Sequence, residues 1–344
     1  MPSQPPLPPL LTTYLSKQPE SSLTLISSIL GATSNWLVLR YLYAALGTSS
    51  SPNVTIGSDE LANGVKRKVV LVSFLRSWEF WRAEAKRLGL DLARLADKQQ
   101  FAFVDGLSEL FNTPSTASGA PTNTGSAVRT TLPLRSQPGT VPGRGPPSTV
   151  TAERLGNEGL RQREPGTAKK LHFTGHGVAA LDVMEKDIIA EINRQKSSMA
   201  EGDEMLLIID QPDFLLAATG ASMGIGATEM AEWVTGLQQH AHATVLTLAA
   251  DSPLIHNAST SGIQQSSPIE TEHAAFAIGM AHRARSVMQL RTLETGAARD
   301  VSGVLRISRG GGWTGEAEDN LEERELLYYI QRDGGVRVFG RGES

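Results

Sequence analysis

Residues 205–216 read MLLIIDQPDFLL and carry the strongest structural signal of the chain. An apolar run that ends in an acid and is followed by Pro212 is typical of a buried strand in a parallel sheet. In P-loop nucleoside triphosphatases the acid at this place, here Asp210, holds the Mg²⁺ of the bound nucleotide. The partner motif of those enzymes, G-x-x-x-x-G-K-[ST], does not occur in the sequence. The stretch therefore predicts a nucleoside-triphosphatase type of fold that lacks half of its chemistry.

Apolar runs and amphipathic segments alternate on both sides of this stretch. Buried strands are expected at 23–30, 69–75, 101–104 and 243–250, with further strands at 286–293 and 303–309 and a terminal hairpin around Asp333–Gly334. Helices are expected at 36–46, 77–88, 178–196 and 228–239, the last with Thr228 as N-cap, and a short helix is expected around Phe276. This order predicts an α/β fold with a largely parallel central sheet and antiparallel strands at its C-terminal edge.

Two segments differ in composition from the rest of the chain. Residues 1–20, which begin MPSQPPLPPLL, are proline-rich, and we expect them to form a flexible arm. From about 112 to 170, Pro, Gly, Ser, Thr and Arg dominate and no apolar period persists, which predicts a disordered insert. Because strands of similar type flank the insert, residues 21–340 are expected to form a single interrupted domain.

The overall composition is that of a globular protein. Of the 344 residues, 40% are hydrophobic and 20% are charged. The net charge of −4 gives no overall basic field, so contact with nucleic acid would need a local patch or partner chains. The absence of cysteine excludes disulfides, thiolate metal sites and cysteine nucleophiles. No apolar run reaches the roughly 20 residues of a membrane span, and the N-terminus has no signal-peptide pattern, so we expect no membrane association.

The segment SSILGATSNWLVLRYL, which starts at Ser27, lies where a phosphate-binding loop would be. Gly31 is its glycine, and Ser34 and Asn35 stand where Lys and Ser/Thr would open the helix. Without the lysine the β- and γ-phosphates lose their main cation, and a single glycine gives the backbone little freedom to wrap a phosphate. Trp36 is bulky enough to fill such a pocket. We therefore expect a plain strand-to-helix turn, with these polar residues as the degenerate remainder of a nucleotide site.

Other candidate metal and catalytic residues are equally isolated. Asp210 without phosphate partners makes a poor Mg²⁺ site, and the alternative is that it caps a loop or pairs locally. His172 and His176 have the spacing of a metal pair on a helix, but Gly175 and Gly177 oppose a helix there and no third ligand is near. We therefore predict no metal site, no catalytic residue and no bound cofactor.

Arginines gather near the C-terminal strands. Arg283, Arg285 and Arg309 are candidates for reaching into a neighbouring subunit's site or for contacting RNA phosphates, and Arg291 and Arg306 lie on the same strands. The alternative is solvated charge at a sheet edge. The glycine run 310–312 that follows is expected to be a flexible loop rather than a phosphate cradle, because no helix follows it.

Several segments stand in an order that resembles a known family. They read VLVSFLRSWEFWRAEAKRLGLDL, FAFVDGLSELF, LLIIDQPDFLL, HAAFAIGMAHRARSVMQLR and, before the terminal hairpin, DVSGVLRIS. Together they resemble the sixth, accessory subunit of the eukaryotic Elongator complex. The resemblance covers most of 20–111 and 178–340 and omits the insert. It rests on the order and spacing of the segments, since that family has no catalytic signature.

The resemblance implies a RecA-like, P-loop NTPase-type fold in a subunit whose own nucleotide site is degenerate. It implies a hetero-hexameric ring with Elongator subunits four and five, two copies of each, associated with the catalytic Elongator subunits. That ring binds tRNA and releases it in an ATP-sensitive way, and the complex supports wobble-uridine modification of tRNA and was first linked to transcription elongation. The implied localisation is cytoplasmic and nuclear. By analogy with RecA-like rings, loops 211–227 and 251–271 would face the pore and contact tRNA.

These expectations combine into a non-catalytic structural subunit that contributes interfaces to a tRNA-binding ring. Two alternatives stay open. One is an active nucleoside triphosphatase that uses Asp210 and an atypical loop at 31–35. The other is a DNA-repair scaffold similar to the recombinase paralogues, which would share the fold and bind a different ligand.

Overall fold

The structure is a computed structural model, and all of its described residues belong to one compact unit. These residues are 7–47, 66–112, 168–220, 223–255, 266–294, 296, 298–315 and 321–341. Most of the predicted insert at 112–170 therefore lies outside the described residues. None of the described helices is long and apolar enough to cross a membrane.

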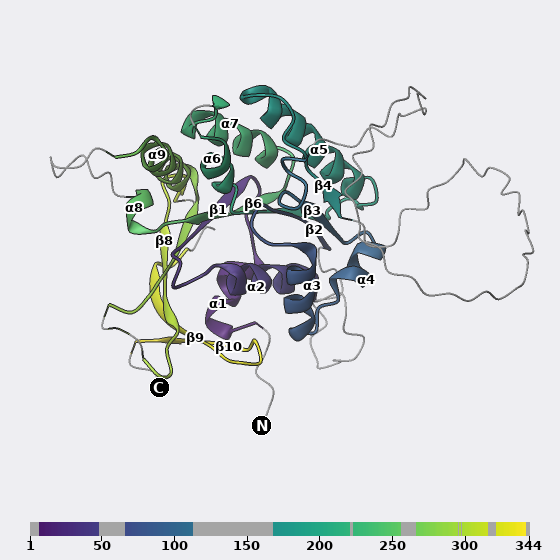
Figure 1. Ribbon diagram of the computed structural model, residues 1–344. Helices are drawn as coiled ribbons and strands as arrows, with labels where there is room; N and C mark the ends of the chain where they lie inside the picture. Colours follow the sequence, from purple (N-terminus) through teal and green to yellow (C-terminus); the bar gives the residue numbers. More distant parts are fainter. Residues whose placement is uncertain are drawn as a thin grey trace, which may run out of the picture. The chain divides into compact units, whose positions relative to one another are not determined.

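Within the described residues, ten strands form one sheet in the order β10-β9-β8-β7-β1-β6-β5-β2-β3-β4 (Figure 1). The pairs from β7 through β1, β6, β5, β2 and β3 to β4 are parallel, and those joining β7, β8, β9 and β10 are antiparallel. The prediction of an α/β fold with antiparallel strands at the C-terminal edge is confirmed. The strands are β1 (Ser22–Ser28), β2 (Arg67–Ser73), β3 (Phe101–Asp105), β4 (Lys169–Lys170), β5 (Glu204–Asp210), β6 (Ala243–Ala249), β7 (Ser286–Arg291), β8 (Gly303–Arg309), β9 (Arg324–Ile330) and β10 (Val336–Gly340).

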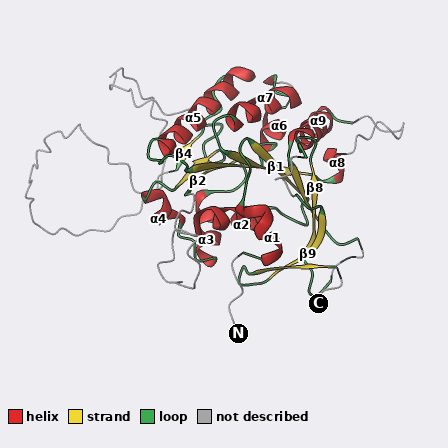
Figure 2. Cartoon of the chain, turned by 180° about the vertical axis from the view of Figure 1, so that it is seen from behind, coloured by secondary structure: helices red, strands yellow, loops and turns green. Residues whose placement is uncertain are grey.

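Helices cover both faces of the sheet (Figures 1 and 2). One layer consists of α1 (Pro9–Ser16), α2 (Asn35–Leu46), α3 (Trp78–Arg87) and α4 (Leu92–Asp97). The opposite layer consists of α5 (Val178–Lys196), α6 (Phe214–Thr219), α7 (Ala227–Gln238) and α9 (Pro268–Arg283), and the short α8 (Ser252–Ile255) lies against α9.

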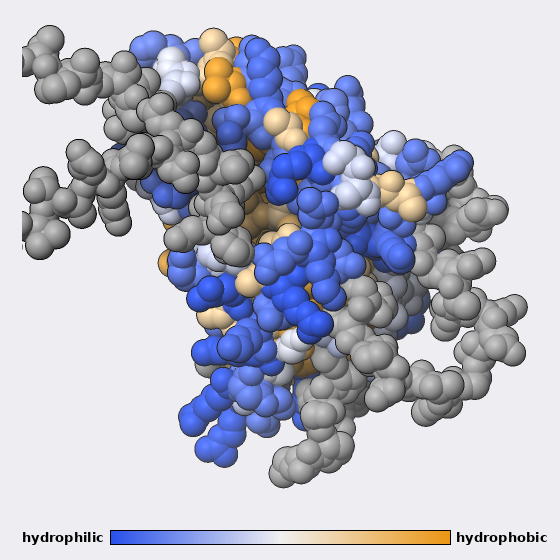
Figure 3. All heavy atoms as spheres, turned by 90° about the vertical axis from the view of Figure 1, so that its right-hand side faces the viewer, coloured by the Kyte–Doolittle hydropathy of each residue, from blue (hydrophilic) through white to orange (hydrophobic). Residues whose placement is uncertain are grey.

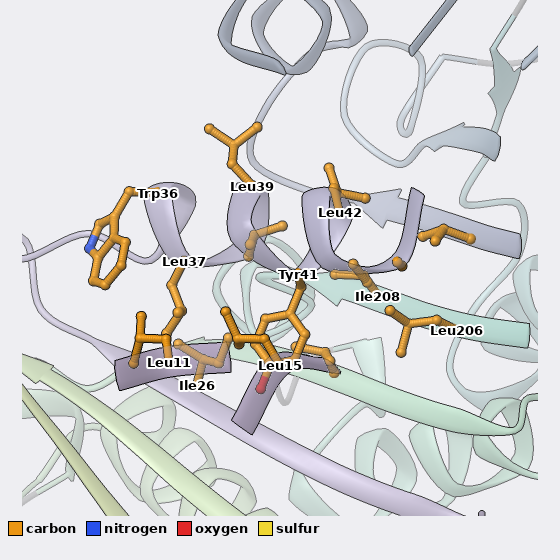
Figure 4. Packing of buried hydrophobic residues seen from close by; sticks show 14 of the residues in the cluster. Leu11, Leu15, Ile26, Trp36, Leu37, Leu39, Tyr41, Leu42, Leu206 and Ile208 are labelled. Carbon is orange, nitrogen blue, oxygen red and sulfur yellow. The ribbon is translucent and has the colours of Figure 1, made fainter. Parts of the chain in front are cut away.

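The apolar run of β5 is explained by these two layers. Leu206 and Ile208 join the core under α1 to α4, whereas Leu207 and Ile209 join the core under α5, α6, α7 and α9. Successive side chains of a strand point to opposite faces, so a strand covered on both faces is apolar at every position. Figure 4 shows the first core, in which α1 and α2 pack against residues of β1 and β5.

The expectation of a flexible arm at 1–20 is wrong for residues 9–16, which form α1. Pro9 occupies the first helical position, where its fixed backbone angle is favourable and no hydrogen bond from its nitrogen is lost. Leu11 and Leu15, one turn apart, are 0% and 2% exposed and pack into the core. The Tyr14 hydroxyl donates to the backbone oxygen of Glu322 at 2.9 Å. The apolar i, i+4 spacing of a helix is present in this segment, but the prediction of a flexible arm followed the proline content instead.

The boundaries of several other elements also differ from the predictions. The helix expected from Thr228 begins at Ala227, because the Glu229 carboxylate accepts from the Gly226 amide at 2.9 Å. The expected loops 211–227 and 251–271 contain α6, α8 and the start of α9, while 221–222 and 256–265 lie outside the described residues. Lys169 and Lys170, at the end of the expected insert, form β4 beside β3.

Candidate functional site

The carboxyl ends of β1, β2, β3, β5 and β6 meet at one edge of the sheet, which we call the carboxyl edge. In open α/β sheets ligands bind at this edge. The strand register places Asp210 directly beside both Ser73 and Thr247, and Ser73 beside Asp105. Each of these polar residues ends or nearly ends an apolar strand, so their convergence follows from the parallel pairing.

Asp210 is 0% exposed, and both of its carboxylate oxygens are occupied by donors from this chain. The Ser73 hydroxyl donates to Oδ2 at 2.8 Å, and the Thr247 hydroxyl donates to Oδ1 at 2.9 Å. Nη1 of Arg76 lies 3.2 Å from each of the two oxygens. Asp210 is therefore paired locally, as in the alternative named from the sequence.

Arg76 is the cation of this network. It comes from the loop between β2 and α3, its side chain is 14% exposed, and its guanidinium lies 5.6 Å and 5.8 Å from the ring centroids of Phe80 and Trp81. Burial raises the pKa of Asp210, and Arg76 and the two hydroxyls oppose that rise. A Mg²⁺ ion at Asp210 would have to displace these donors, and a buried arginine deprived of its partner is costly.

The connection from β1 to α2 is a tight turn, as the sequence predicts. The Ala32 amide donates to the Ile29 oxygen at 2.9 Å, and the amides of Leu37 and Val38 donate to the Ser34 oxygen at 2.9 and 3.1 Å. A Cβ at Gly31 would lie 2.9 Å from Thr292, which leaves no room beside the glycine. The geometry of this turn differs from the open ring of amides that binds phosphate.

The remaining polar residues of the turn serve the fold. The Ser34 Oγ is buried and hydrogen-bonds with none of the described residues, and Asn35 accepts from the Thr33 hydroxyl at 2.5 Å. The expectation that Trp36 could fill a nucleotide pocket is wrong. Its ring is 3% exposed and lies in the core, 4.8 Å between centroids from Tyr328 of β9.

A second buried pair lies next to Asp210 and was not predicted from the sequence. Oδ2 of Asp213 lies 3.1 Å from Nε2 of His273 and accepts from the Ala249 amide at 3.1 Å. Nδ1 of His273 lies 3.1 Å from the Leu254 oxygen. Gln211, which stands between Asp210 and Asp213 in the sequence, has a positive φ of 56°, and this conformation favours a sharp change of chain direction. The pair joins α6, α8, α9 and β6 at the carboxyl edge.

The histidines of HFTGHG do not converge on a metal site. Nδ1 of His172 lies 3.1 Å from the backbone oxygens of Glu109 and Asn112, and His176 is exposed. Among the described residues, no three His, Cys, Asp or Glu side chains lie close enough to hold a metal ion.

The three candidate arginines lie at the opposite, amino edge of the parallel strands. Arg285 precedes β7, and Arg309, at the end of β8, is in register with the first residue of β7. The Arg309 guanidinium stacks 3.9 Å from the centroid of the Trp313 ring. Nη1 of Arg283 donates to the Thr235 hydroxyl at 2.6 Å. The structure thus separates these arginines from loops 211–227 and 251–271, which follow the carboxyl ends of β5 and β6.

Gly310, Gly311 and Gly312 are held by hydrogen bonds to the end of α9 and to its connection with β7, so the expectation of a flexible loop is wrong. Their amides donate to the backbone oxygens of Arg285, Ala281 and Ala284 at 2.9, 3.2 and 2.9 Å. The Ala281 oxygen is one of the carbonyls that the end of α9 leaves without a partner inside the helix, whereas Arg285 lies beyond the helix, directly before β7. A Cβ at any of the three positions would lie within 2.0 to 2.4 Å of a backbone oxygen. The glycines are therefore required by the close packing of two backbones.

A cavity of about 870 Å³ opens at the same edge, and we call it the amino-edge cavity. It is bounded by the segment from α1 into β1, by the starts of β2 and β5, and by the connection from α9 to β7. Its polar and charged lining residues include Lys17, Ser22, Arg67, Glu204, Arg283 and Arg285.

Three exposed apolar side chains follow strands that end at the carboxyl edge. Leu30, Leu75 and Phe111, which follow β1, β2 and β3, are 86%, 43% and 55% exposed. The side of the molecule that carries α4 and α5 is mainly hydrophilic, with hydrophobic residues in small separate groups (Figure 3).

A scan against protein-family models and a search of the curated proteins each gave no match. Function is therefore inferred from the chemistry of the two sheet edges.

Proposed function

We propose that this chain is a non-catalytic structural subunit with a RecA-like fold. The observation that carries the proposal is the Asp210 carboxylate, whose oxygens are occupied by Ser73, Thr247 and Arg76. The turn after β1 and Asp210 lie at the same edge with only β6 between their strands, which is where a triphosphate and its Mg²⁺ would bind. The turn after β1 has no lysine to bind a phosphate, and the Asp210 carboxylate is already paired with Arg76.

The partners proposed for this subunit are Elongator subunits four and five, in a hetero-hexameric ring that binds tRNA and works with the catalytic Elongator subunits in the cytoplasm and nucleus. The sequence resemblance is the source of these names. The exposed Leu30 and Leu75 support the assembly, because apolar side chains at the carboxyl edge would be covered by a neighbouring subunit.

The test is co-expression of the full chain with subunits four and five, followed by mass determination of the purified assembly. A hexamer with two copies of each subunit is expected. Leu30→Glu and Leu75→Glu should weaken the assembly, whereas Val183→Glu on the exposed face of α5 is the matched control and should not. A monomer that binds neither partner would overturn the proposal, as would Mg²⁺-dependent turnover of ATP by the purified chain.

A further inference from the structure

A buried histidine joins α8 to α9, and the two helices lie side by side (Figures 1 and 2). Nδ1 of His273, on α9, lies 3.1 Å from the backbone oxygen of Leu254, on α8. Nε2 of the same ring lies 3.1 Å from Oδ2 of Asp213, which directly precedes α6. His273 and Asp213 are 3% and 6% exposed, so bulk water has little access to the pair.

Each nitrogen of the His273 ring faces an oxygen, and this sets the number of protons that the site must hold. The Leu254 oxygen is a carbonyl, which only accepts, so Nδ1 carries a hydrogen. The contact with Asp213 needs a second hydrogen, either on Nε2 or on the carboxyl oxygen. His273 and Asp213 therefore hold two protons between them in this arrangement, whichever side chain carries the second one.

Loss of one of these protons leaves too few hydrogens for the two contacts. A neutral ring beside an ionised carboxylate has one N–H for two acceptors. Because a hydrogen bond to an ionised group is about twice as strong as one between neutral groups, the remaining N–H is expected to stay on Asp213. The Leu254 oxygen then faces the lone pair of Nδ1, and the contact that joins α8 to α9 is lost.

The other titratable side chains on the described elements around His273 have contacts elsewhere or are exposed. The elements β6, α6 and α8 carry none, and those of α7, α9 and the residue before α8 are Glu229, Glu232, Asp251, Glu270, Glu272, His282 and Arg283. Glu229 and the two glutamates of α9 accept from backbone amides at helix starts. Arg283 donates to the Thr235 hydroxyl, and Glu232 and His282 are exposed. Among the described residues, the proton-dependent contacts of α8 are therefore those of His273 and Asp213.

The segment 251–255 also contacts the turn after β1. Oδ1 of Asp251 accepts from the Leu30 amide at 3.0 Å, while Leu254 is held by His273. The segment therefore bridges α9 and the turn between β1 and α2. Its anchoring by His273 bears on residues of the carboxyl edge as well as on α8.

We propose that His273 and Asp213 form a proton-dependent latch, which fixes α8 to α9 while the pair holds two protons and releases it when one is lost. Histidine is the side chain whose charge ordinarily changes near neutral pH, and buried histidines act as switches by this change. The latch differs from the Asp210 network, in which the cation is a guanidinium that keeps its proton over the same range. It is independent of assembly with other subunits, because all of its groups belong to this chain.

The experiment uses the absence of cysteine from the chain. Ser252→Cys, at an exposed position of α8, gives the full chain a single site for a fluorescent label, whose anisotropy is followed from about pH 6 to about pH 8.5. We expect the anisotropy to fall as the pH rises, because α8 becomes more mobile once the contact with Leu254 is lost. His282→Gln, an exposed histidine on the same helix, is the matched control and should keep this response.

Two variants of the pair should abolish the response in different ways. His273→Gln has no ring to titrate, so the anisotropy should not change with pH. Asp213→Asn provides an amide that donates to Nε2 of a neutral ring and leaves Nδ1–H on Leu254, so the anisotropy should stay at its acidic value. His256, which lies outside the described residues, is tested by His256→Gln, and this variant should respond as the wild type does.

A constant anisotropy in the labelled wild-type background overturns the proposal. So does a pH response that persists in both His273→Gln and Asp213→Asn, or one that is lost only in His256→Gln. Thermal unfolding of each variant at about pH 6 identifies any that is not folded. Asp213→Asn decides the outcome if His273→Gln fails to fold, because it keeps the histidine in place.

Discussion

The two edges of the same sheet use polar residues in opposite ways. At the carboxyl edge, the Asp210 carboxylate is closed off by hydroxyls and a guanidinium of the chain itself. At the amino edge, Arg283 and Arg285 are among the residues that line a cavity of about 870 Å³. A buried polar group whose partners lie within the chain stabilises the fold. The difference shows that the position of a motif in a fold does not by itself identify a binding site.

The largest effect is expected from Asp210→Ala. The variant leaves Arg76 buried without its anion and two hydroxyls without an acceptor, so it should lose about 3–5 kcal/mol of unfolding free energy. Urea unfolding of the full chain measures this loss. The double variant Asp210→Leu with Arg76→Met removes both charges and should recover part of the loss. If the single variant is as stable as the wild type, the carboxyl-edge network is not structural.

Leu11→Ala tests whether α1 is part of the folded unit. Leu11 is 0% exposed in the core under α2, and truncating a buried leucine costs about 2–5 kcal/mol. Leu10→Ala, at a neighbouring position that is only partly buried, is the control. Equal stability of Leu11→Ala and the wild type would show that α1 is not packed and would support the prediction of a flexible arm.

Gly311→Ala tests the cap that holds the arginines of the amino edge. Its Cβ would lie 2.4 Å from the His282 oxygen, so the backbone must move, at a cost of about 1–3 kcal/mol. Gly279→Ala in the same helix is the matched control, because a Cβ there meets nothing within 4 Å. Replacing a helical glycine by alanine where a Cβ has room usually stabilises a protein by about 0.5–1 kcal/mol. Thermal unfolding of the two variants should therefore shift in opposite directions, and a shift in the same direction contradicts the cap.

Ser22→Ala is expected to have the smallest effect on folding. Removing a buried hydroxyl that makes no hydrogen bond with the described residues should leave stability unchanged or slightly higher. Thermal unfolding of the full chain measures this effect. A loss of stability would show that the hydroxyl has a partner within the chain.

The sequence predicted the sheet better than it predicted the site. Continuous apolar runs such as that of β5 identify strands covered on both faces, and the terminal hairpin was placed by Asp333–Gly334. The partners of Asp210 were missed because Ser73, Arg76 and Thr247 are distant in sequence and are joined only by strand register. Ser73 and Thr247 could have been predicted, because each is a polar residue at or near the end of an apolar run.

The predictions of a flexible loop at 310–312 and of a flexible arm at 1–20 were wrong for a common reason. In both, composition suggested mobility, while long-range contacts decided the conformation. Gly310–Gly312 are fixed by the end of α9, and Pro9–Ser16 by the core under α2. Neither contact is visible in local sequence, because each joins residues far apart in the chain or depends on the close approach of two backbones.

Hydrogen-exchange mass spectrometry of the full chain, with and without Mg²⁺-ATP, tests the account of the carboxyl edge most directly. We expect Mg²⁺-ATP to leave exchange unchanged in residues 28–37 and 210–216, because the Asp210 carboxylate is already occupied by Ser73, Thr247 and Arg76. Slowed exchange in these residues would contradict the account and would make Asp210 part of a nucleotide site.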